Sequence, residues 1–283
     1  MLLKSYSKIN LYLNLISRDK QGYHILDSLF SYIDLYDELE INSISAEDHK
    51  IDANYKLDLD DNIIYKALVK FGEVYKTKNK FLVNHKKNIP MGAGLGGGSS
   101  NAAVTLNYLY DFFAIDETLE NKINLAKSLG ADVPFFLTNK TKYISGIGEI
   151  LGEDCNVCEL PIIIIKPTTS LDTALVFSKV TKENFSIPLK EHPVDLLDKD
   201  KLWNFLERTN NDLLNVSQNI SKDISRIFSL LAHSNKVIVK MSGTGPTCFV
   251  ICKNKKDSAE ILKKLRNNFP DYFIRESKLL SST

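Results

Sequence analysis

The sequence predicts a mixed α+β fold with two domains. The chain has 283 residues, which suggests one large domain or two ordinary ones, enough to bury a sizeable core. Alternating apolar and polar residues indicate strands within residues 1–45, and strands are interleaved with helices beyond residue 161. The turn-rich stretch Gly146–Pro161 lies between these two regions. We therefore predict an N-terminal domain over residues 1–153 and a C-terminal domain over residues 154–283.

The N-terminal region opens with a strand in which apolar and polar residues alternate strictly over Lys8–Leu15. One face carries Ile9, Leu11, Leu13 and Leu15, and the other carries Lys8, Asn10, Tyr12 and Asn14. Solvent is the default neighbour of such a polar face, but asparagine is a poor strand former, and two asparagines favour a face that binds a ligand. A second strand is predicted within Glu38–Ile44.

The remaining elements follow from periodicity and from residues that stop helices. A helix is predicted over Asn62–Tyr75, with Ile63, Ala67, Phe71 and Val74 on one face. A strand over Phe81–His85 follows, and a helical pattern over Leu119–Leu129 ends at Gly130. The strands predicted in the C-terminal half are Ile162–Ile165, Val237–Lys240, Cys248–Cys252 and Tyr272–Arg275. The helices predicted there lie near Val194–Glu207, Asp223–Ala232 and Asp257–Asn267.

Composition and charge exclude several classes of protein. The chain is 43% hydrophobic and 25% charged, which is ordinary for a globular protein, and its net charge of +1 favours neither nucleic acid nor an anionic membrane as a partner. The longest apolar runs, such as Pro161–Ile165, are far too short to span a membrane. The N-terminus shows no secretory signal. We therefore expect a cytoplasmic protein that binds neither nucleic acid nor membrane.

Four cysteines fall into two closely spaced pairs, Cys155 with Cys158 and Cys248 with Cys252. A zinc site built from both pairs is conceivable. The second pair, however, lies in an apolar stretch that is typical of a buried strand, with both thiols on one face. Free thiols in a reducing compartment are therefore the preferred interpretation, and no metal ligands are assigned.

The most informative stretch is the glycine run within Pro90–Ala103, where five of the chain's 13 glycines fall within seven residues. Such a loop lets a ligand approach the backbone closely. Ser99, Ser100 and Asn101 then supply residues typical of a helix N-cap, and the helix that follows has Ala102, Leu106, Leu109 and Phe113 on one face. Backbone N–H groups and the positive end of a helix dipole therefore meet here, which predicts a site for an anion, most often a phosphate.

Neither of the two familiar phosphate motifs explains this loop. Gly92, Gly94 and Gly97 match the letters of the dinucleotide fingerprint G-x-G-x-x-G, but Lys86–Pro90 separate the predicted strand from the first glycine. The nucleotide-binding P-loop fits no better, because Gly98 occupies the position of its essential lysine. A flexible linker is also disfavoured, since linker glycines are usually interspersed with polar residues.

Five motifs in order resemble those of the GHMP kinases, the family of galactokinase, homoserine kinase, mevalonate kinase and phosphomevalonate kinase. These motifs are Lys8–Leu11, Gly22–His24, the glycine loop, Gly130–Phe136 and Ser242–Pro246, and they extend over the whole chain. The resemblance implies an N-terminal α/β domain, a ferredoxin-like C-terminal domain and an active site between them. It also implies ATP and Mg²⁺ as cofactors, without identifying the residues that hold the metal.

The resemblance further implies roles for individual residues. The catalytic residues implied are Lys8 and Asp132, with Asp132 as general base and Lys8 holding it ionised. The ATP-binding residues implied are Pro90, Met91, Gly92, Ala93, Gly94, Leu95, Gly96, Gly97, Gly98, Ser99 and Ser100. The substrate-binding residues implied are Asn10, Tyr23, His24, Phe177, Gly243 and Thr244. Taken by themselves, Asp132 would be interpreted as an N-cap or turn aspartate, His24 as a packed surface histidine and Ser242–Gly245 as a plain turn.

The triple-glycine form followed by Ser-Ser implies a particular acceptor, the cytidine diphosphate adduct of methylerythritol, which would be phosphorylated on its 2-hydroxyl. Tyr23 and Phe177 would sandwich the cytosine ring of this small molecule. Two alternatives stay open: a family member acting on another alcohol, such as homoserine or mevalonate, and a catalytically silent protein that senses a nucleotide or sugar. Lys8 and Asp132 argue against the silent protein, and Tyr23–His24 against other alcohols. A monomer or weak homodimer is expected.

Overall fold

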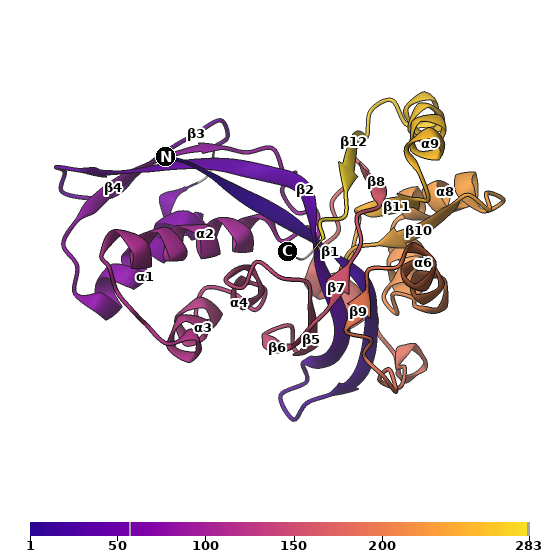
Figure 1. Cartoon of the computed structure of the whole chain (residues 1–283), viewed down its shortest axis with the longest axis horizontal. Helices are drawn as coiled ribbons and strands as arrows, with labels where there is room; N and C mark the ends of the chain where they lie inside the picture. The colour runs from indigo at the N-terminus through magenta and orange to yellow at the C-terminus, as the bar shows by residue number, and fades with distance from the viewer. Residues whose placement is uncertain (57, 282–283) are drawn as a thin grey trace. The chain divides into compact units, whose positions relative to one another are not determined.

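The computed structural model describes residues 1–56 and 58–281, and its elements are labelled in Figure 1. The strands are β1 (Leu2–Arg18), β2 (His24–Ile44), β3 (Lys50–Ala53), β4 (Lys80–Lys86), β5 (Lys142–Gly146), β6 (Ile150–Asp154), β7 (Asn156–Val157), β8 (Pro161–Lys166), β9 (Asp195–Leu196), β10 (Val237–Met241), β11 (Cys248–Cys252) and β12 (Phe273–Lys278). The α-helices are α1 (Ile63–Tyr75), α2 (Gly97–Phe112), α3 (Leu119–Lys127), α4 (Val133–Phe136), α5 (Thr173–Ser178), α6 (Lys199–Arg208), α7 (Leu214–Ile220), α8 (Lys222–Leu231) and α9 (Lys255–Asn268). Two short 3₁₀ helices are η1 (Leu59–Asp61) and η2 (Lys182–Asn184).

The chain forms two compact units that are interleaved in sequence. Unit 1 comprises Met1–Ser7, Leu35–Pro90 and Gly96–Asn139, and unit 2 comprises Lys8–Asp34, Met91–Leu95 and Lys140–Thr283. The long strands β1 and β2 therefore each contribute one end to unit 1 and the other end to unit 2. The division of the sequence into domains after residue 153 stays a prediction.

Unit 1 combines a small sheet with helices. Strand β4 pairs antiparallel with the second half of β2 and parallel with β3. Helices α1 and α2 pack against each other, and α2 also contacts α3 and α4. Asn62 caps α1 by accepting a hydrogen bond from the Ile64 amide, so the helix starts where the sequence predicts it. The arrangement places the N-terminus of α2 directly after the glycine run.

Unit 2 contains an antiparallel four-stranded sheet in the order β10-β11-β8-β12. The chain visits β8, then helices including α8, then β10 and β11, then α9 and finally β12 (Figure 1). This βαββαβ succession with this strand order is the ferredoxin-like topology that the family resemblance implied. Alternate residues of the central strand, Ile163 and Ile165, face a core shared with Ile227 of α8 and Leu265 of α9. The strand pairs β2–β5 and β5–β6 complete the sheet structure of this unit, beside the short parallel pair β7–β9.

Several predicted boundaries are wrong for local reasons. Gly146–Pro161 was expected to be mainly turns, but β6 and β7 lie in it, because each finds a partner strand. The segment predicted as helical from Val194 begins with β9, and α6 starts only after Asp198, whose side chain accepts a hydrogen bond from the Lys201 amide. In α1 the buried face is Ile64, Ala67, Leu68 and Phe71, whereas Val74 is 50% exposed. The strands predicted at Lys8–Leu15 and within Glu38–Ile44 are parts of the much longer β1 and β2, and the other predicted elements are present with ends shifted by a few residues.

The polar face of β1 does not face solvent. Lys8, Asn10, Tyr12 and Asn14 are all buried, as are the leucines and isoleucine on the opposite face. Burial on both faces requires every polar group on the strand to find a partner, because an unpaired polar group removed from water destabilises the fold. Within residues 1–56 and 58–281, no helix combines the length and apolarity needed to cross a bilayer.

Candidate functional site

The glycine run forms a loop that leads directly into α2. Gly92, Gly94 and Gly96 have φ angles of 60°, 70° and 67°, in the left-handed region that residues with a Cβ adopt only with strain. Helix α2 begins at Gly97, with Gly96 at the N-cap position. The first-turn N–H groups of α2 therefore stand at the end of a loop with few side chains, the arrangement that the sequence predicted for an anion site.

The predicted capping role of Ser99, Ser100 and Asn101 is wrong, because all three lie inside α2. Glycine in the left-handed conformation ends the loop instead, and Gly96 has no side chain with which to cap the helix. Ser100 is buried and its hydroxyl accepts a hydrogen bond of 2.7 Å from the Ser5 hydroxyl. Asn101 is also buried and directs its amide nitrogen at Asp37, 3.0 Å away. These side chains anchor the first turn of α2, and its N–H groups are left to other acceptors.

Gly97 and Gly98 are neighbours in the first turn, but they differ in the space around them. A Cβ on Gly97 would lie 3.0 Å from both Lys87 Nζ and Ile89 Cγ2, whereas a Cβ on Gly98 would meet only Ile63 Cγ2, at 3.6 Å. The first is tighter than normal van der Waals contact and the second is ordinary contact. Gly97 therefore lets α2 start against the segment that precedes the loop.

We expect Gly97→Ala to lower the melting temperature and weaken ATP binding, because the added methyl group must displace Lys87 or Ile89 from the base of the loop. Overpacking of this kind destabilises a protein by roughly 1–3 kcal/mol. Gly98→Ala is the matched control for stability, since alanine is favoured over glycine inside a helix and finds room here. Thermal unfolding and calorimetric titration with ATP check the pair. Equal stability of the two variants would contradict the packing argument.

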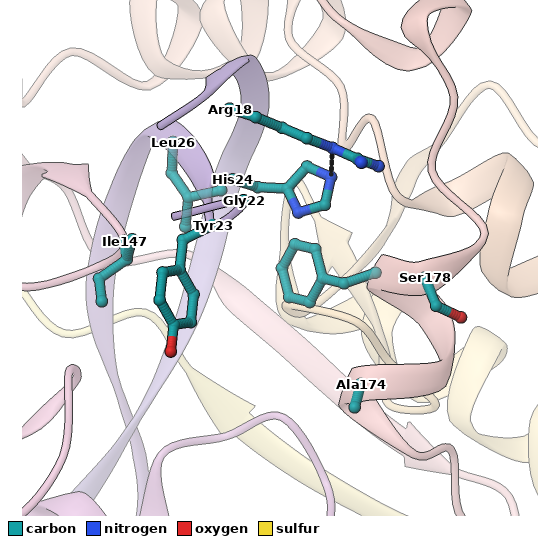
Figure 2. A pocket seen from close by; sticks show the side chains of 9 residues that line it. Arg18, Gly22, Tyr23, His24, Leu26, Ile147, Ala174 and Ser178 are labelled. Carbon is teal, nitrogen blue, oxygen red and sulfur yellow. Dashed lines mark hydrogen bonds between the residues drawn. The ribbon is translucent and has the colours of Figure 1, made fainter. Parts of the chain in front are cut away.

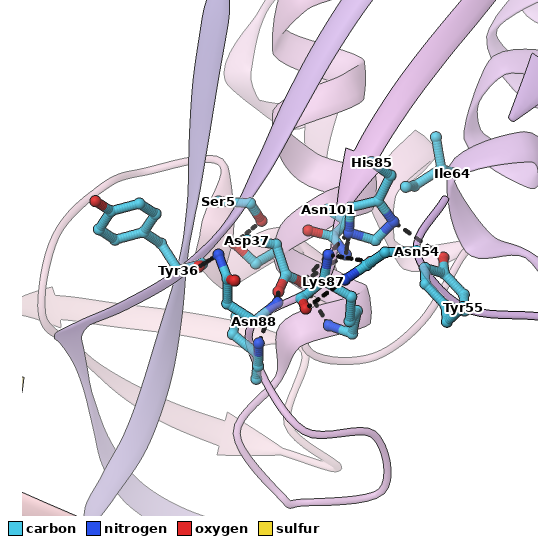
Figure 3. Close-up of polar contacts among 12 residues, drawn as sticks. Ser5, Tyr36, Asp37, Asn54, Tyr55, Ile64, His85, Lys87, Asn88 and Asn101 are labelled. Atoms are coloured by element: carbon cyan, nitrogen blue, oxygen red, sulfur yellow. Dashed lines mark hydrogen bonds and ion pairs between the residues drawn. The ribbon is translucent and has the colours of Figure 1, made fainter. Parts of the chain in front are cut away.

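Asp37 is the centre of a buried polar cluster under the start of the glycine loop (Figure 3). Its side chain is 0% exposed, and its carboxylate accepts hydrogen bonds of 2.8 Å from the backbone amides of Asn88 and Ile89. The Lys87 ammonium and the Asn101 amide donate to its other oxygen. One carboxylate thus fixes the last residues before the loop and the first turn of the helix after it.

The neighbours of Asp37 stabilise the ionised form of its carboxyl group. Burial by itself would raise the pKa of this carboxyl, but the hydrogen bond from His85, the Lys87 charge and the Ile89 amide outweigh that effect and lower the pKa to about 2. Burial lowers the pKa of Lys87, while the Asp37 charge opposes that shift. No role was predicted for Asp37, although its place between Leu35 and Leu39 on one face of a strand was a signal that this carboxylate has a buried partner.

Lys8 lies on the part of β1 that belongs to unit 2 and is 4% exposed. Its ammonium donates a hydrogen bond of 2.9 Å to Asn10 Oδ1 and lies 4.0 Å from the centre of the Phe30 ring. Asn10 Oδ1 also accepts from the Gly243 amide at 3.0 Å, and Asn10 Nδ2 donates to the Ser28 hydroxyl at 3.1 Å. Asn10 therefore connects the predicted catalytic lysine to the second glycine turn within the same unit.

The second glycine turn, Ser242–Pro246, packs against the first part of the glycine loop within unit 2. Gly243 and Gly245 have φ angles of 56° and 80°, as a turn with this composition predicts. The Ser242 hydroxyl donates 2.9 Å to the Gly94 carbonyl, and a Cβ on Gly94 would stand only 2.7 Å from the Ser242 carbonyl oxygen. Thr244 is buried, and its carbonyl accepts from the Ser217 hydroxyl at 3.0 Å. The two predicted glycine segments thus meet.

Asp132 belongs to unit 1 and stands at the N-cap position of the short helix α4. Its side chain is half-buried and does not make the capping hydrogen bond that an N-cap aspartate usually makes. Asp132 therefore lies where the local sequence predicts it, in the turn before α4, without acting as a side-chain cap. Buried Val133, Pro134, Phe135 and Phe136 follow it and fix the backbone at this point.

Tyr23, His24 and Phe177 line one cavity of about 460 Å³ within unit 2 (Figure 2). Phe177 comes from α5 and stacks on the His24 ring, with centroids 5.0 Å apart and planes inclined by 29°. Tyr23 is 56% exposed, so its ring is accessible to a ligand. The lining also contains Gly22 of the Gly22–His24 motif and five residues for which no role was predicted, namely Arg18, Leu26, Ile147, Ala174 and Ser178. The structure therefore brings together the three residues predicted to hold a flat base.

Among the described residues, no group of three or more His, Cys, Asp or Glu side chains is arranged to hold a metal ion. Cys158, Cys248 and Cys252 are free thiols, as predicted, and the latter two are buried in β11. The Cys155 thiol lies 3.1 Å from the Pro193 carbonyl oxygen. Burial raises the pKa of the Cys155 thiol to about 11, so this thiol stays protonated at neutral pH.

Family models and individual relatives both match this chain to the GHMP kinases. Residues 62–140 match the model for the N-terminal domain of GHMP kinases, and residues 203–271 match the model for their C-terminal domain. A 4-diphosphocytidyl-2-C-methyl-D-erythritol kinase of Clostridium acetobutylicum is 31% identical over 280 residues, covering 97% of this chain and 99% of the relative. A kinase of the same name from Ehrlichia canis is 32% identical and covers 99% of both chains.

Solved structures agree with these matches. A crystal structure of a 4-(cytidine 5′-diphospho)-2C-methyl-D-erythritol kinase has a TM-score of 0.82 and 25% identity, covering 100% of both chains. A crystal structure of L. major mevalonate kinase in complex with R-mevalonate has a TM-score of 0.73 and 14% identity, covering 100% of this chain and 97% of that one, and shows likeness of fold.

Proposed function

Since the chain belongs to the GHMP kinase family, we propose that it transfers the γ-phosphoryl group of ATP to the 2-hydroxyl of 4-diphosphocytidyl-2-C-methyl-D-erythritol. The products are the 2-phosphate and ADP. The observation that carries this choice of acceptor is the cavity lined by Tyr23, His24 and Phe177. Aromatic walls suit a nucleobase, whereas homoserine and mevalonate have no ring to stack. The names of relatives that match the chain over nearly its full length support the same acceptor.

ATP would bind along the glycine loop, through backbone N–H groups of the loop and of the first turn of α2. The left-handed glycines, which leave the loop with few side chains, support close approach of a polyphosphate to the backbone. Mg²⁺ would be held mainly by the ATP phosphates, as this hard cation prefers few protein ligands. Ser99 is the better candidate than Ser100 for a contact with the metal or a phosphate, because the Ser100 hydroxyl is buried against Ser5.

The chemical step needs a proton acceptor and a positive charge. Asp132 would accept the proton of the 2-hydroxyl as its oxygen bonds to the γ-phosphorus and the bond from phosphorus to the ADP oxygen breaks. Lys8 would stabilise the negative charge spread over the transferring phosphoryl group. Its hydrogen bond to Asn10 supports this role, because it fixes the ammonium before the reaction and leaves less reorganisation for the transition state. Asn10, Gly243 and Thr244 remain proposed substrate contacts.

We expect Tyr23→Ala and Phe177→Ala to raise the KM for the cytidine adduct while the KM for ATP changes little. Base–aromatic stacking is worth about 1–3 kcal/mol per base, which corresponds to roughly a five- to 150-fold rise in KM if KM follows binding. Steady-state kinetics with each substrate varied in turn checks this result.

Phe185→Ala is the matched control for these variants. Phe185 also contacts the His24 ring, with centroids 6.0 Å apart, but it is not part of the cavity lining. Phe177 packs against the core of unit 2, so thermal melts must accompany the kinetics. A large fall in melting temperature with an unchanged acceptor KM in the folded variant would contradict the pocket assignment.

The proposed function is tested by measuring ADP release from ATP with a panel of alcohols: the cytidine adduct, its uridine analogue, homoserine and mevalonate. The proposal predicts turnover with the cytidine adduct at least tenfold above that with any other acceptor. Turnover with homoserine or mevalonate alone would identify a different kinase of the family. ATP binding without turnover of any acceptor would favour the silent sensor.

A further inference from the structure

Arg18 lies against the edge of His24 in the candidate base pocket, and its guanidinium is anchored at two points (Figure 2). Its terminal Nη2 donates 2.9 Å to the carbonyl of Val180, which is buried. Its Nε donates 3.0 Å to Nε2 of His24. A guanidinium has only donors and does not lose its proton in proteins. His24 Nε2 must therefore be the acceptor of this bond and carries no hydrogen.

The proton of neutral His24 must then lie on its other ring nitrogen. An imidazole with an accepting Nε2 carries its single hydrogen on Nδ1, which becomes a donor. Burial, and then the Arg18 charge, lower the pKa of His24, which keeps the ring neutral at neutral pH. Stacking on Phe177 holds the plane of the ring. The hydrogen bond from Arg18 thus makes Nδ1 of His24 a donor, and His24 lines the cavity.

The two pyrimidines differ at the position that a single ring donor reads best. N3 of cytosine is an acceptor, whereas N3 of uracil carries a hydrogen and is a donor. An Nδ1–H group therefore donates a hydrogen bond to cytosine N3, but it faces a second donor at uracil N3–H. In the other tautomer Nδ1 is an acceptor, which would pair with uracil N3–H and would leave cytosine N3 without a donor. A buried polar group without its partner is unfavourable, so a site with a fixed donor discriminates strongly.

We propose that Arg18 is a specificity-determining positioning residue, which fixes His24 as an Nδ1–H donor and so makes the pocket prefer cytosine over uracil. This inference rests on the proposed function for the choice of acceptor. Arg18 touches His24 and need not touch the base. Aromatic stacking cannot provide this preference, because cytosine and uracil present similar faces.

The test combines steady-state kinetics with an NMR measurement of which ring nitrogen of His24 carries the hydrogen. In the wild-type protein, ¹⁵N-edited NMR of the histidine ring should show His24 protonated at Nδ1. In Arg18→Met the donor to Nε2 is lost, and the spectrum should shift toward the Nε2–H form. The ratio of kcat/KM for the cytidine adduct to that for its uridine analogue should fall by roughly tenfold or more, with KM for ATP unchanged. Arg18→Lys keeps a cation that can donate and should restore part of the ratio.

Lys182→Met is the matched control, because it removes a positive charge from a residue that lines the neighbouring cavity together with Arg18, whereas the hydrogen bond to His24 Nε2 comes from Arg18. It should leave both the tautomer and the ratio unchanged. The proposal is wrong if Arg18→Met, judged folded by its melting temperature, keeps the wild-type tautomer, or if the tautomer changes and the ratio does not. Failure of the wild-type protein to phosphorylate either adduct would instead overturn the proposed function, and the NMR measurement on the free protein would still decide whether Arg18 fixes the tautomer.

Discussion

Replacing Asp132 with asparagine is expected to lower kcat by about two to four orders of magnitude, the usual contribution of a general base. Asparagine has the shape of aspartate but cannot accept the proton of the acceptor hydroxyl. The side chain makes no capping hydrogen bond to α4, so the substitution removes no helix cap. ADP release at saturating substrate measures the loss, and calorimetry should show that ATP still binds.

A control and a second variant make this prediction specific. Asp111→Asn changes an exposed carboxylate of α2 in the same unit and should leave kcat unchanged. Lys8→Ala should be about as damaging as Asp132→Asn, and the double variant should lose much less than the two single losses combined, because residues that act in one step are not additive. Near-normal turnover of Asp132→Asn would remove this residue from the catalytic role.

Replacing Asp37 with asparagine is expected to lower the free energy of unfolding by about 3–5 kcal/mol, the usual result of removing one member of a buried ion pair. Lys87 would keep its charge without its partner, and the Asn88 and Ile89 amides would lose a charged acceptor. Because these amides precede the glycine loop, we also expect weaker ATP binding in the folded variant. Denaturant unfolding at pH 7 measures the stability change, and calorimetry measures the affinity.

The stabilisation by Asp37 has a defined pH dependence. The pKa of its carboxyl is lowered in the folded state from its ordinary value of 3.8 to about 2, so the carboxylate stabilises the fold above the unfolded pKa. That contribution is lost as the pH falls through 3.8 toward about 2. The stability difference between the wild-type protein and Asp37→Asn should therefore be largest near neutral pH and shrink below pH 3.8. Asp34→Asn, an exposed position on the same strand, is the control, and equal effects of the two substitutions would contradict the role of Asp37.

The features that the sequence predicts correctly depend on local pattern. The glycine loop before α2, the individual strands of the sheet around β8 and the turn at Ser242–Pro246 follow from glycine spacing and from residue periodicity, whereas the ferredoxin-like topology was implied by the family resemblance. Tyr23, His24 and Phe177 were placed together through family resemblance, since α5 and β2 are far apart in the sequence. The structure brings them to one cavity.

The features that could not be predicted from the sequence depend on contacts between residues far apart in the chain. The acceptor role of Asp37 requires Asn88 and Ile89, about 50 residues away, and the anchoring of Arg18 requires Val180. The capping prediction at Ser99–Asn101 is wrong because Gly96 takes the left-handed conformation and the polar side chains turn to Ser5 and Asp37. Both faces of β1 are buried, so alternation by itself did not reveal that its polar face lies inside the protein.

The most direct test of the proposed reaction is ³¹P NMR of the mixture formed from ATP and 4-diphosphocytidyl-2-C-methyl-D-erythritol. The 2-hydroxyl is on a carbon that bears a methyl group and no hydrogen. Transfer to it therefore gives a new phosphomonoester signal that is not split by a hydrogen on the ester carbon, together with the signals of ADP. A phosphomonoester signal split by such a hydrogen would mean transfer to another hydroxyl, and release of inorganic phosphate alone would mean hydrolysis of ATP. Either of these results would contradict the proposed reaction.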